Sequence, residues 1–545
     1  MRPTRLLFAL VIAFGCAAAA PAKTLRLASA FDPQTMDPHA LALLYHTRVI
    51  TQVYENLVGR DKNFRLEPQL ATAWESLDGG RRWRFKLRPG VKFHDGSPLT
   101  ADDVIFSLER SAAAPSQRNF HLRNMTSARR VDDLTVDVLL NAPDAVLPEK
   151  TWLIAIMSKA WATKHGVLKA QDYNGKQETH AVRNVNGTGP YKLQRYEPDA
   201  RTILVANRDW WGTKQTGLPA ADKAVTEVHY VVMFSDATRL AALASGEVDL
   251  VLDPPFQDVA RLKQDKRVKV SEVTDLGMQY LGFDQWRAEL EGSDTSSSNN
   301  SSNNSSNNSS NSRGRNPFKD VRVRRAVYHA IDIDLILQKV LRGQARATGA
   351  FMSNLVDGYD PKLAPRLKYD PPAARALLKE AGYADGFAVT MDCVNTAYRE
   401  AVCQAVAAML TQVGIRVRLN STPAAQFFPK LTQATTAFYE VGWTPGTDPY
   451  FIFAALFRTW DNAGNGTFNA GRYSNPKLDA LIDAIRVEGN LDKRRTLIGD
   501  ALRMLAADLP MVPMYHRTLA WAMRPSVSLV HWPNDVLELR WVQVD

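Results

Sequence analysis

Cysteine is scarce in this sequence, and the signatures of common hydrolases are missing. The 545 residues include three cysteines and ten histidines, and the histidines are scattered singly. No G-x-S-x-G, H-E-x-x-H or Cys–His pattern occurs that would assemble a nucleophile or a zinc site. Adjacent acids such as Asp102-Asp103 are explained by helix capping or by a surface position. The sequence therefore gives no reason to expect an enzyme, a resident metal or another cofactor.

Long apolar runs are missing after the first residues. The chain is 45% hydrophobic and 23% charged, an ordinary globular balance, and no later run reaches the ~20 residues of a membrane helix. The start has an export pattern: Arg2 and Arg5, an apolar core at 6–15, and A-P-A at 20–22. We expect a signal peptide over 1–22, cleaved near Ala22. The alternative is lipidation at Cys16, but the bulky Phe14 makes a poor lipobox.

Dense basic blocks are also missing, although the net charge is positive. The formal charge is +10, and removal of the two signal-peptide arginines lowers it to +8. The basic residues are spread out and no aromatic ladder accompanies them, which excludes a nucleic-acid footprint. Such a surface favours solvent, anionic solutes or an anionic membrane face. We expect no nucleic-acid partner.

Two cysteines, Cys393 and Cys403, remain after cleavage of the signal peptide. An exported protein meets an oxidising space, so a disulfide between them is expected. Cys393 follows a predicted strand and Cys403 lies in the next helix; a bridge over so short a loop adds about 3 kcal/mol. The alternative is two buried free thiols. A metal pair is disfavoured, because no histidine or third cysteine stands nearby.

The second half of the chain has the strand–helix–strand order of a parallel sheet. A predicted strand at 387–392 is followed by a helix at 396–412 and a strand at 415–419. Another apolar strand ends at Gly442-Trp443 before a Pro/Gly turn, and loops at such strand ends bind ligands in α/β sheets. Residues 296–312 are all Ser or Asn, which predicts a disordered insertion in a surface loop.

The most informative stretch is residues 83–110, W-R-F-K-L-R-P-G-V-K-F-H-D-G-S-P-L-T-A-D-D-V-I-F-S-L-E-R. Trp83, Phe85 and Leu87 alternate with basic residues, so the segment predicts a strand with one apolar face and then a Pro-Gly turn. Thr100 is placed to cap a helix whose first turn carries Asp103.

This stretch resembles the signature segment of the family 5 extracellular solute-binding proteins, which deliver peptides, nickel and related solutes to bacterial ABC importers. G-T-G-P-Y at 187–191 and Y-S-N-P-K-L-D at 473–479 are similar to further family segments. The resemblance covers nearly the whole mature chain. It implies an α/β, bilobal periplasmic-binding-protein-like fold with an extra α+β domain inserted in the first lobe.

The resemblance also implies a division of the chain. After the signal peptide at 1–22, we expect lobe I from 23–57, 185–282 and 512–545, the inserted domain at 58–184, and lobe II at 283–511 with the Ser/Asn-rich insertion at 293–315.

Candidate ligand contacts follow from the resemblance. The loop after the first strand faces the ligand in the family, and so does the end of the strand before W-T-P-G. The candidates are Phe31, Asp32, Met36, Tyr439, Gly442, Trp443 and Thr444. Arg399, near a helix start, is a candidate for binding a carboxylate.

Both charged anchors of the family's dipeptide binders are replaced here. Those proteins hold the ligand amine with an Asp in a W-T-x-D turn and its carboxylate with an Arg at a strand end. These positions fall on Gly446 and on or near Cys393. Each lost charge-assisted bond is worth about 1.5–3 kcal/mol, so a plain dipeptide is disfavoured. Asp448 is the candidate replacement for the amine anchor.

The function implied is a monomeric periplasmic substrate-binding subunit of an ABC importer. It would capture a peptide-like or related small solute between two lobes and deliver it to the membrane permease and its ATPase. The alternatives are an exported hydrolase without a recognisable motif, a structural or chaperone-like envelope protein, and a nickel-chelate binder. The last would need a histidine or a carboxylate-bearing chelator in the cleft, and the sequence does not place His516 there.

Overall fold

The computed structural model describes residues 23–291, 313–363, 365–444, 446–461 and 465–545. The expected signal peptide and most of the Ser/Asn insertion lie outside these residues. In the part of the chain that is described, no helix is both long enough and apolar enough to cross a membrane.

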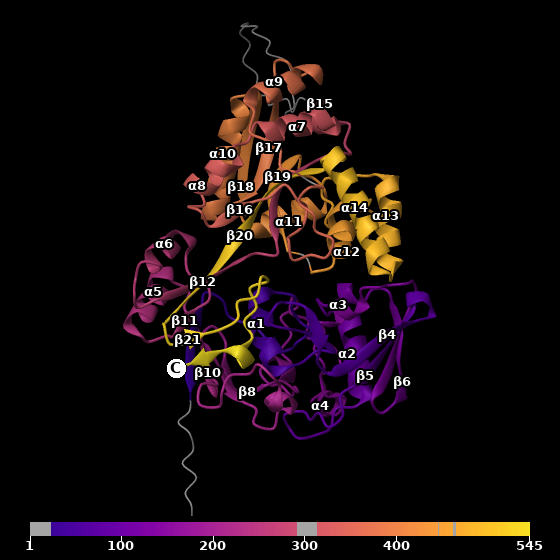
Figure 1. The fold of residues 1–545 in the computed structure, drawn as a ribbon, viewed down its shortest axis with the longest axis vertical. Helices are drawn as coiled ribbons and strands as arrows, with labels where there is room; N and C mark the ends of the chain where they lie inside the picture. Colours follow the sequence, from indigo (N-terminus) through magenta and orange to yellow (C-terminus); the bar gives the residue numbers. More distant parts are fainter. Residues whose placement is uncertain (1–22, 292–312, 364, 445, 462–464) are drawn as a thin grey trace, which may run out of the picture.

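One large sheet runs through both halves of the molecule (Figure 1). Its strand order is β18-β17-β19-β13-β20-β11-β1-β10-β9-β8, and β12 and β16 also pair with β20. We call the elements around β1 and β10 the lower lobe and those around β17 and β19 the upper lobe. The 13-residue β20 (Met511–Met523) passes from one lobe to the other.

The lower lobe is built on the N-terminal strand. β1 (Thr24–Ser29) lies parallel to β10 (Glu227–Val232) and to β11 (Leu250–Val251). The antiparallel β9 (Arg201–Ala206) and β8 (Tyr191–Glu197) extend the sheet. Leu25 and Leu27 of β1 are buried with residues of α1 (Leu44–Val53), so these two alternate side chains define the core face of the strand.

The predicted inserted domain has its own antiparallel sheet and core. Its order is β4 (Ala71–Leu77), β5 (Arg82–Leu87), β7 (Thr135–Leu140) and β6 (Met125–Asp132), packed with α2 (Ala101–Ala112). Trp83, Phe85 and Leu87 are buried as predicted. Thr100 caps α2 in a capping box with Asp103. β2 (Val58–Arg60) and α3 (Leu147–Thr151) contribute Val58 and Leu147 to the same core.

The upper lobe contains the predicted strand–helix–strand unit. β17 (Phe387–Val394) lies parallel to β18 (Ile415–Thr422) and to β19 (Phe438–Trp443), with α10 (Ala397–Thr411) between β17 and β18 in the chain. β13 (Met278–Phe283) pairs antiparallel with β19 and with the first half of β20.

The strand pairing corrects two expected lobe boundaries. Residues 278–282 belong to β13 and lie in the upper sheet, so the chain crosses at about 275–277, between β12 (Lys269–Thr274) and β13. The start of β20 pairs with β13 and β16 (Ala345–Ala347), so the second crossing lies near Arg517, not at 512. An apolar strand fits either sheet, and only its hydrogen-bond partners decide between them.

The remaining elements complete the two lobes. The other helices are α4 (Lys159–Lys164), α5 (Asp236–Ser245), α6 (Val259–Leu262), α7 (Val321–His329), α8 (Ile333–Lys339), α9 (Pro371–Glu380), α11 (Ala424–Thr432), α12 (Pro449–Ile452), α13 (Pro476–Val487) and α14 (Leu491–Asp508). Two-stranded pairs are β2 with β3 (Leu66–Pro68), β14 (Glu289–Glu291) with β15 (Arg313–Arg315), and β21 (Val527–Ser528) with β22 (Gln543–Val544).

The G-T-G-P-Y segment meets the end of α1 at very close range. A Cβ on Gly187 would lie 2.0 Å from the carbonyl oxygen of Val53, and one on Gly189 would lie 2.6 Å from that of Gln52. The amide of Gly189 donates to Val53 at 2.9 Å. These glycines therefore allow backbone to pack on backbone, and no phosphate loop is needed to explain them.

Gly187→Ala should lower the free energy of unfolding by about 2–3 kcal/mol, because its methyl group has no room beside Val53. Urea denaturation followed by circular dichroism would measure the loss. Gly489→Ala is the matched control: a Cβ there meets nothing within 4 Å, so its effect should stay within about 0.5 kcal/mol. Equal effects of the two variants would contradict the close-packing explanation.

Candidate ligand-binding site

The ends of β13 and β19 bring several polar side chains to the boundary between the lobes. In the ladder, Met278 lies opposite Trp443, and Gln279 lies opposite both Gly442 and Tyr515 of β20. The register thus places the end of β19 beside the strand that connects the lobes. Arg399, in the first turn of α10, reaches this same place.

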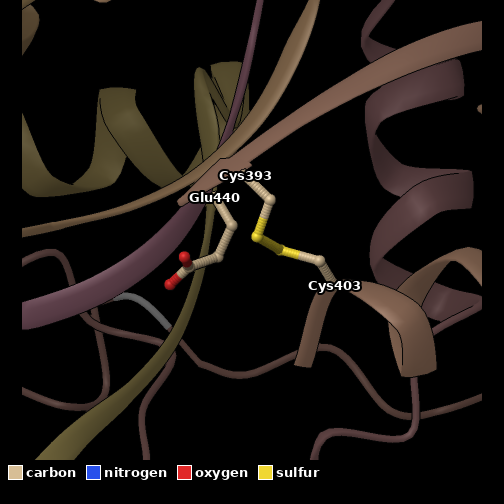
Figure 2. Close-up of side chains that lie close together, drawn as sticks. All are labelled: Cys393, Cys403 and Glu440. Carbon is tan, nitrogen blue, oxygen red and sulfur yellow. A yellow bond between two sulfur atoms is a disulfide. The ribbon is translucent and has the colours of Figure 1, made fainter. Parts of the chain in front are cut away.

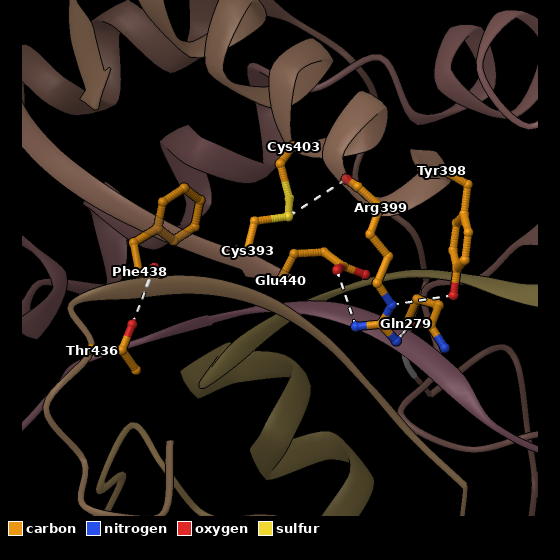
Figure 3. Close-up of a disulfide and its surroundings, with 8 residues drawn as sticks. All are labelled: Gln279, Cys393, Tyr398, Arg399, Cys403, Thr436, Phe438 and Glu440. Carbon is orange, nitrogen blue, oxygen red and sulfur yellow. Dashed lines mark hydrogen bonds and ion pairs between the residues drawn. A yellow bond between two sulfur atoms is a disulfide. The ribbon is translucent and has the colours of Figure 1, made fainter. Parts of the chain in front are cut away.

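Arg399 donates to three groups from three different elements (Figure 3). Its Nη2 donates to Gln279 Oε1 at 2.9 Å, its Nε to the hydroxyl of Tyr398 at 3.2 Å, and its Nη1 to Glu440 Oε2 at 3.4 Å. The side chain of Arg399 is 14% exposed, whereas that of Glu440 is 1% exposed. The arginine therefore keeps one edge toward solvent while its acidic partner is enclosed.

In this cluster, the positive charge of Arg399 is only partly balanced by the carboxyl group of Glu440. Burial raises the pKa of Glu440, although Arg399 and Arg517 act in the opposite direction. Burial alone would lower the pKa of Arg399, but the nearby Glu440 and Tyr398 raise it above its ordinary value. Among the described residues, Glu440 Oε1 and the hydroxyl of Tyr515 have no hydrogen-bond partner. The arginine thus stays charged beside a carboxyl group that is hard to ionise.

A disulfide joins Cys393, near the end of β17, to Cys403 in α10. Both cysteines are fully buried, and the ten-residue segment that the bridge closes carries Arg399. The Sγ of Cys393 lies 3.5 Å from the carbonyl oxygen of Arg399. The bridge therefore fixes the first turn of α10, which carries Arg399, against the sheet.

Cys393, Cys403 and Glu440 are the one group of three potential metal ligands found among the described residues (Figure 2). The two sulfur atoms are bonded to each other, so neither is a thiolate that could coordinate a metal. Glu440 in turn faces Arg399. This group is a structural bridge next to an ion pair.

The candidates after β1 have different surroundings. Phe31 is 49% exposed and stacks on Tyr45, with 5.4 Å between ring centroids. Asp32 is buried and accepts bonds from the hydroxyl of Tyr196 at 2.8 Å and the amide of Asp199 at 2.9 Å. Met36 has no exposed surface and packs in the lower core. Of the three, Phe31 is the one with a side chain available to a ligand in this conformation.

The candidates on β19 also separate into core and surface. The ring of Tyr439 is buried over Gly282, where an added Cβ would clash with it. A Cβ on Gly442 would meet the amide of Gln279, so the glycine makes room for that side chain. Trp443 is half-buried against Phe468, with 4.3 Å between ring centroids, and Thr444 is exposed. Trp443 and Thr444 are therefore the members of this set that reach the lobe boundary.

Asp448 is already bound within the upper lobe. Its two carboxylate oxygens accept from Arg494 at 2.7 and 2.8 Å, and Oδ1 also caps α12 by accepting from the amide of Tyr450 at 2.8 Å. Burial raises its pKa despite the bonds from Arg494. A ligand ammonium group would have to compete with that arginine for the carboxylate.

The sequence reasoning missed Gln279, Glu440 and Tyr515 as neighbours of Arg399, and Arg517 as a charge that acts on Glu440. Glu440 had a signal that could have found it, since it is the single acid inside the apolar run F-Y-E-V-G-W. An acid in a buried strand needs a partner. The other three come from strands whose pairing the sequence does not reveal. His516 is buried and bonded to the carbonyl oxygen of Gly277 at 2.8 Å.

Replacing both cysteines by serine should lower the free energy of unfolding by about 3 kcal/mol, because the unfolded chain regains the entropy of the closed loop. Guanidinium denaturation of the double variant under oxidising conditions would measure this. The wild type treated with a reductant after unfolding should show the same loss. A double variant as stable as the oxidised wild type would contradict this role.

Comparison with known proteins identifies the family. The model of the bacterial extracellular solute-binding proteins, family 5 (middle region), matches residues 65–465. The dipeptide-binding protein of Escherichia coli K12 is 26% identical over 550 residues, covering 95% of this chain and 94% of that protein. The glutathione-binding protein GsiB of Pectobacterium atrosepticum is 28% identical over 493 residues, covering 88% and 85%.

A solved structure agrees in fold over the whole length. HbpA2 of Haemophilus parasuis superposes with a TM-score of 0.78 at 24% identity, covering 96% of this chain and all of that one. This likeness confirms the predicted bilobal α/β architecture. Because the family model spans most of the sequence, the chain belongs to the bacterial extracellular solute-binding proteins of family 5.

Proposed function

We propose that this protein is the periplasmic substrate-binding subunit of an ABC importer, and that it captures a carboxylate-bearing, peptide-like solute between its lobes. Family membership supports the class of function. The dipeptide- and glutathione-binding relatives support the solute class, since both names denote peptides that carry carboxylates. The observation that carries the proposal is the position and charge of Arg399.

Arg399 has the capacity to bind a further anion. A guanidinium group has five N–H donors, and three have acceptors among the described residues. The bond to Glu440 is long, at 3.4 Å, and that carboxyl group has a raised pKa. A solute carboxylate would therefore add a short charge-assisted bond without displacing a strong one.

Aromatic side chains on both lobes supply the apolar part of the site. Phe31 stacks on Tyr45 at the end of β1, and Trp443 packs on Phe468 at the end of β19. Phe31 and Phe468 are 49% and 45% exposed. Rigid rings provide contact area at a low entropic cost, which suits the side chains and backbone of a peptide-like solute.

The two chain crossings give the lobes a common hinge. Strands β12 and β13 meet at 275–277, and β20 continues through the same region. Closure about these crossings would enclose the solute, and the permease would then recognise the paired lobe surfaces of the closed form. The solute leaves chemically unchanged, and one monomer suffices for one solute.

Native mass spectrometry of freshly purified protein should show a bound small molecule with at least one carboxylate. Arg399→Ala should lose most of that bound mass, because losing a charge-assisted bond costs about 1.5–3 kcal/mol, or about 10- to 150-fold in affinity. Arg399→Lys should retain part of it.

Arg495→Ala is the matched control, since Arg495 is an exposed upper-lobe arginine paired with Asp357. It should retain the full bound mass. Equal retention by Arg399→Ala and Arg495→Ala would contradict the anchor. A bound molecule that emerges cleaved after incubation would favour the hydrolase alternative.

A further inference from the structure

The lobes also contact each other on the side away from the crossing strands. In Figure 1, β20 passes from one lobe to the other at the left, beside β12. At the right, α3 of the inserted domain and α12 of the upper lobe face each other. Hydrogen bonds confirm that α3 and a residue shortly before it contact α13 and the turn before α12. The amide of Ala145 donates to the carbonyl oxygen of Arg486 at 3.0 Å, and Thr447 binds Glu149.

Thr447 is inserted into a buried ion pair of the inserted domain. Glu149 of α3 is paired with Arg60 of β2, and the two side chains are 9% and 0% exposed. The hydroxyl of Thr447 accepts from Arg60 Nη1 at 3.0 Å and lies 2.9 Å from Glu149 Oε1, to which it donates. The backbone amide of Thr447 also donates to Glu149 Oε1, at 2.9 Å.

The ion pair is held in place by other residues of the inserted domain. The guanidinium carbon of Arg60 lies 4.3 Å from the ring centroid of Phe64 and 4.7 Å from that of Trp152. Arg60 Nη1 also donates to the carbonyl oxygen of Phe64 at 2.8 Å. All of these groups belong to the segments around β2 and α3. These contacts of the ion pair do not involve the upper lobe.

We propose that Arg60 and Glu149 form a preassembled receptor for Thr447, and that this contact latches the upper lobe onto the inserted domain at the open edge of the cleft. Glu149 is then a positioning residue: it holds the turn that follows Trp443 and Thr444, two candidate solute contacts. The latch needs only the two-lobed fold and does not depend on Arg399 or on the identity of the solute.

The arrangement makes the contact reversible. Opening would separate no opposite charges at this contact, because Arg60 and Glu149 stay together in the inserted domain. The four hydrogen bonds of Thr447 to Arg60 and Glu149, and the backbone bond from Ala145 to Arg486, would exchange for bonds to water. Each such exchange has a small net free energy. A salt bridge split between the lobes would instead leave two charges to be resolvated on every opening. The geometry suits a latch that closes and reopens in each transport cycle.

Gly446 explains why the turn can approach so closely. A Cβ on this residue would lie 2.9 Å from Glu149 Oε1, the same atom that binds Thr447. That oxygen is held by Arg60 and by Thr447, so it has little freedom to move away. A side chain at position 446 would push the turn off its receptor, and glycine is the residue that lets the latch close.

The test compares Thr447→Val with Thr447→Ser. Valine keeps the shape and the backbone amide but removes the hydroxyl, and serine keeps the hydroxyl. Hydrogen exchange with mass spectrometry would follow peptides covering residues 438–450 and 145–153, and small-angle X-ray scattering would give the radius of gyration. Both measurements use protein stripped of bound solute by partial unfolding and refolding.

Thr447→Val should exchange about tenfold faster in both peptides and have a larger radius of gyration, because the bonds of the hydroxyl to Arg60 and Glu149 are lost. Thr447→Ser should behave like the wild type. Glu149→Ala also disturbs Arg60, so its unfolding transition must be measured beside these variants. Thr447→Val indistinguishable from the wild type in both measurements would overturn the latch. Arg399→Ala should leave the exchange of the 145–153 peptide and the radius of gyration unchanged, which separates this proposal from the anchor.

Discussion

The architecture depends on one strand that belongs to two lobes. The first half of β20 pairs with β13 and β16, and its second half pairs with β11 and β12. The continuous pairing of β20 with strands of both lobes sets the distance between the lobes. The lobes can still rotate about this shared strand. Backbone hydrogen bonding places Gln279 at this crossing, and the side chain of Arg399 reaches it from α10.

The two places where the lobes meet depend on different interactions. At the crossing strands, covalent continuity keeps the lobes together, and a buried carboxyl group of raised pKa leaves Arg399 incompletely compensated. At the opposite edge, a complete ion pair stays within one lobe and offers only its remaining hydrogen-bonding capacity to Thr447. The first arrangement suits a site that binds a charged solute. The second suits a contact that must form and break.

The disulfide connects the upper-lobe core to this chemistry. It closes the segment between β17 and α10 that presents Arg399, so the arginine starts from a rigid helix end. Rigid support matters because a charge-assisted bond loses much of its value when its partner must first be ordered. Cys393, Cys403 and Glu440 are the one group of metal-ligand residue types among the described residues. Because the two sulfur atoms are bonded to each other, this group is a structural cross-link.

Local features could be predicted from the sequence because neighbouring residues determine them. The alternation of Trp83, Phe85 and Leu87 predicted a buried face, Thr100 predicted a cap, and both were found. The strand–helix–strand unit around α10 followed from the order of its segments. The candidate site was harder: Met36 and Tyr439 proved to be core residues, and both oxygens of Asp448 were already bound.

The family, the class of fold and the residues that form local structure could all be predicted from the amino-acid sequence. Only the tertiary structure decided that Gln279 and Glu440 meet Arg399, or that Thr447 enters an ion pair whose carboxylate lies 298 positions away in the chain. The reason is physical. Periodicity and capping are short-range properties of the chain, whereas a binding site is set by strand pairing and lobe contacts between segments with no local signal for each other.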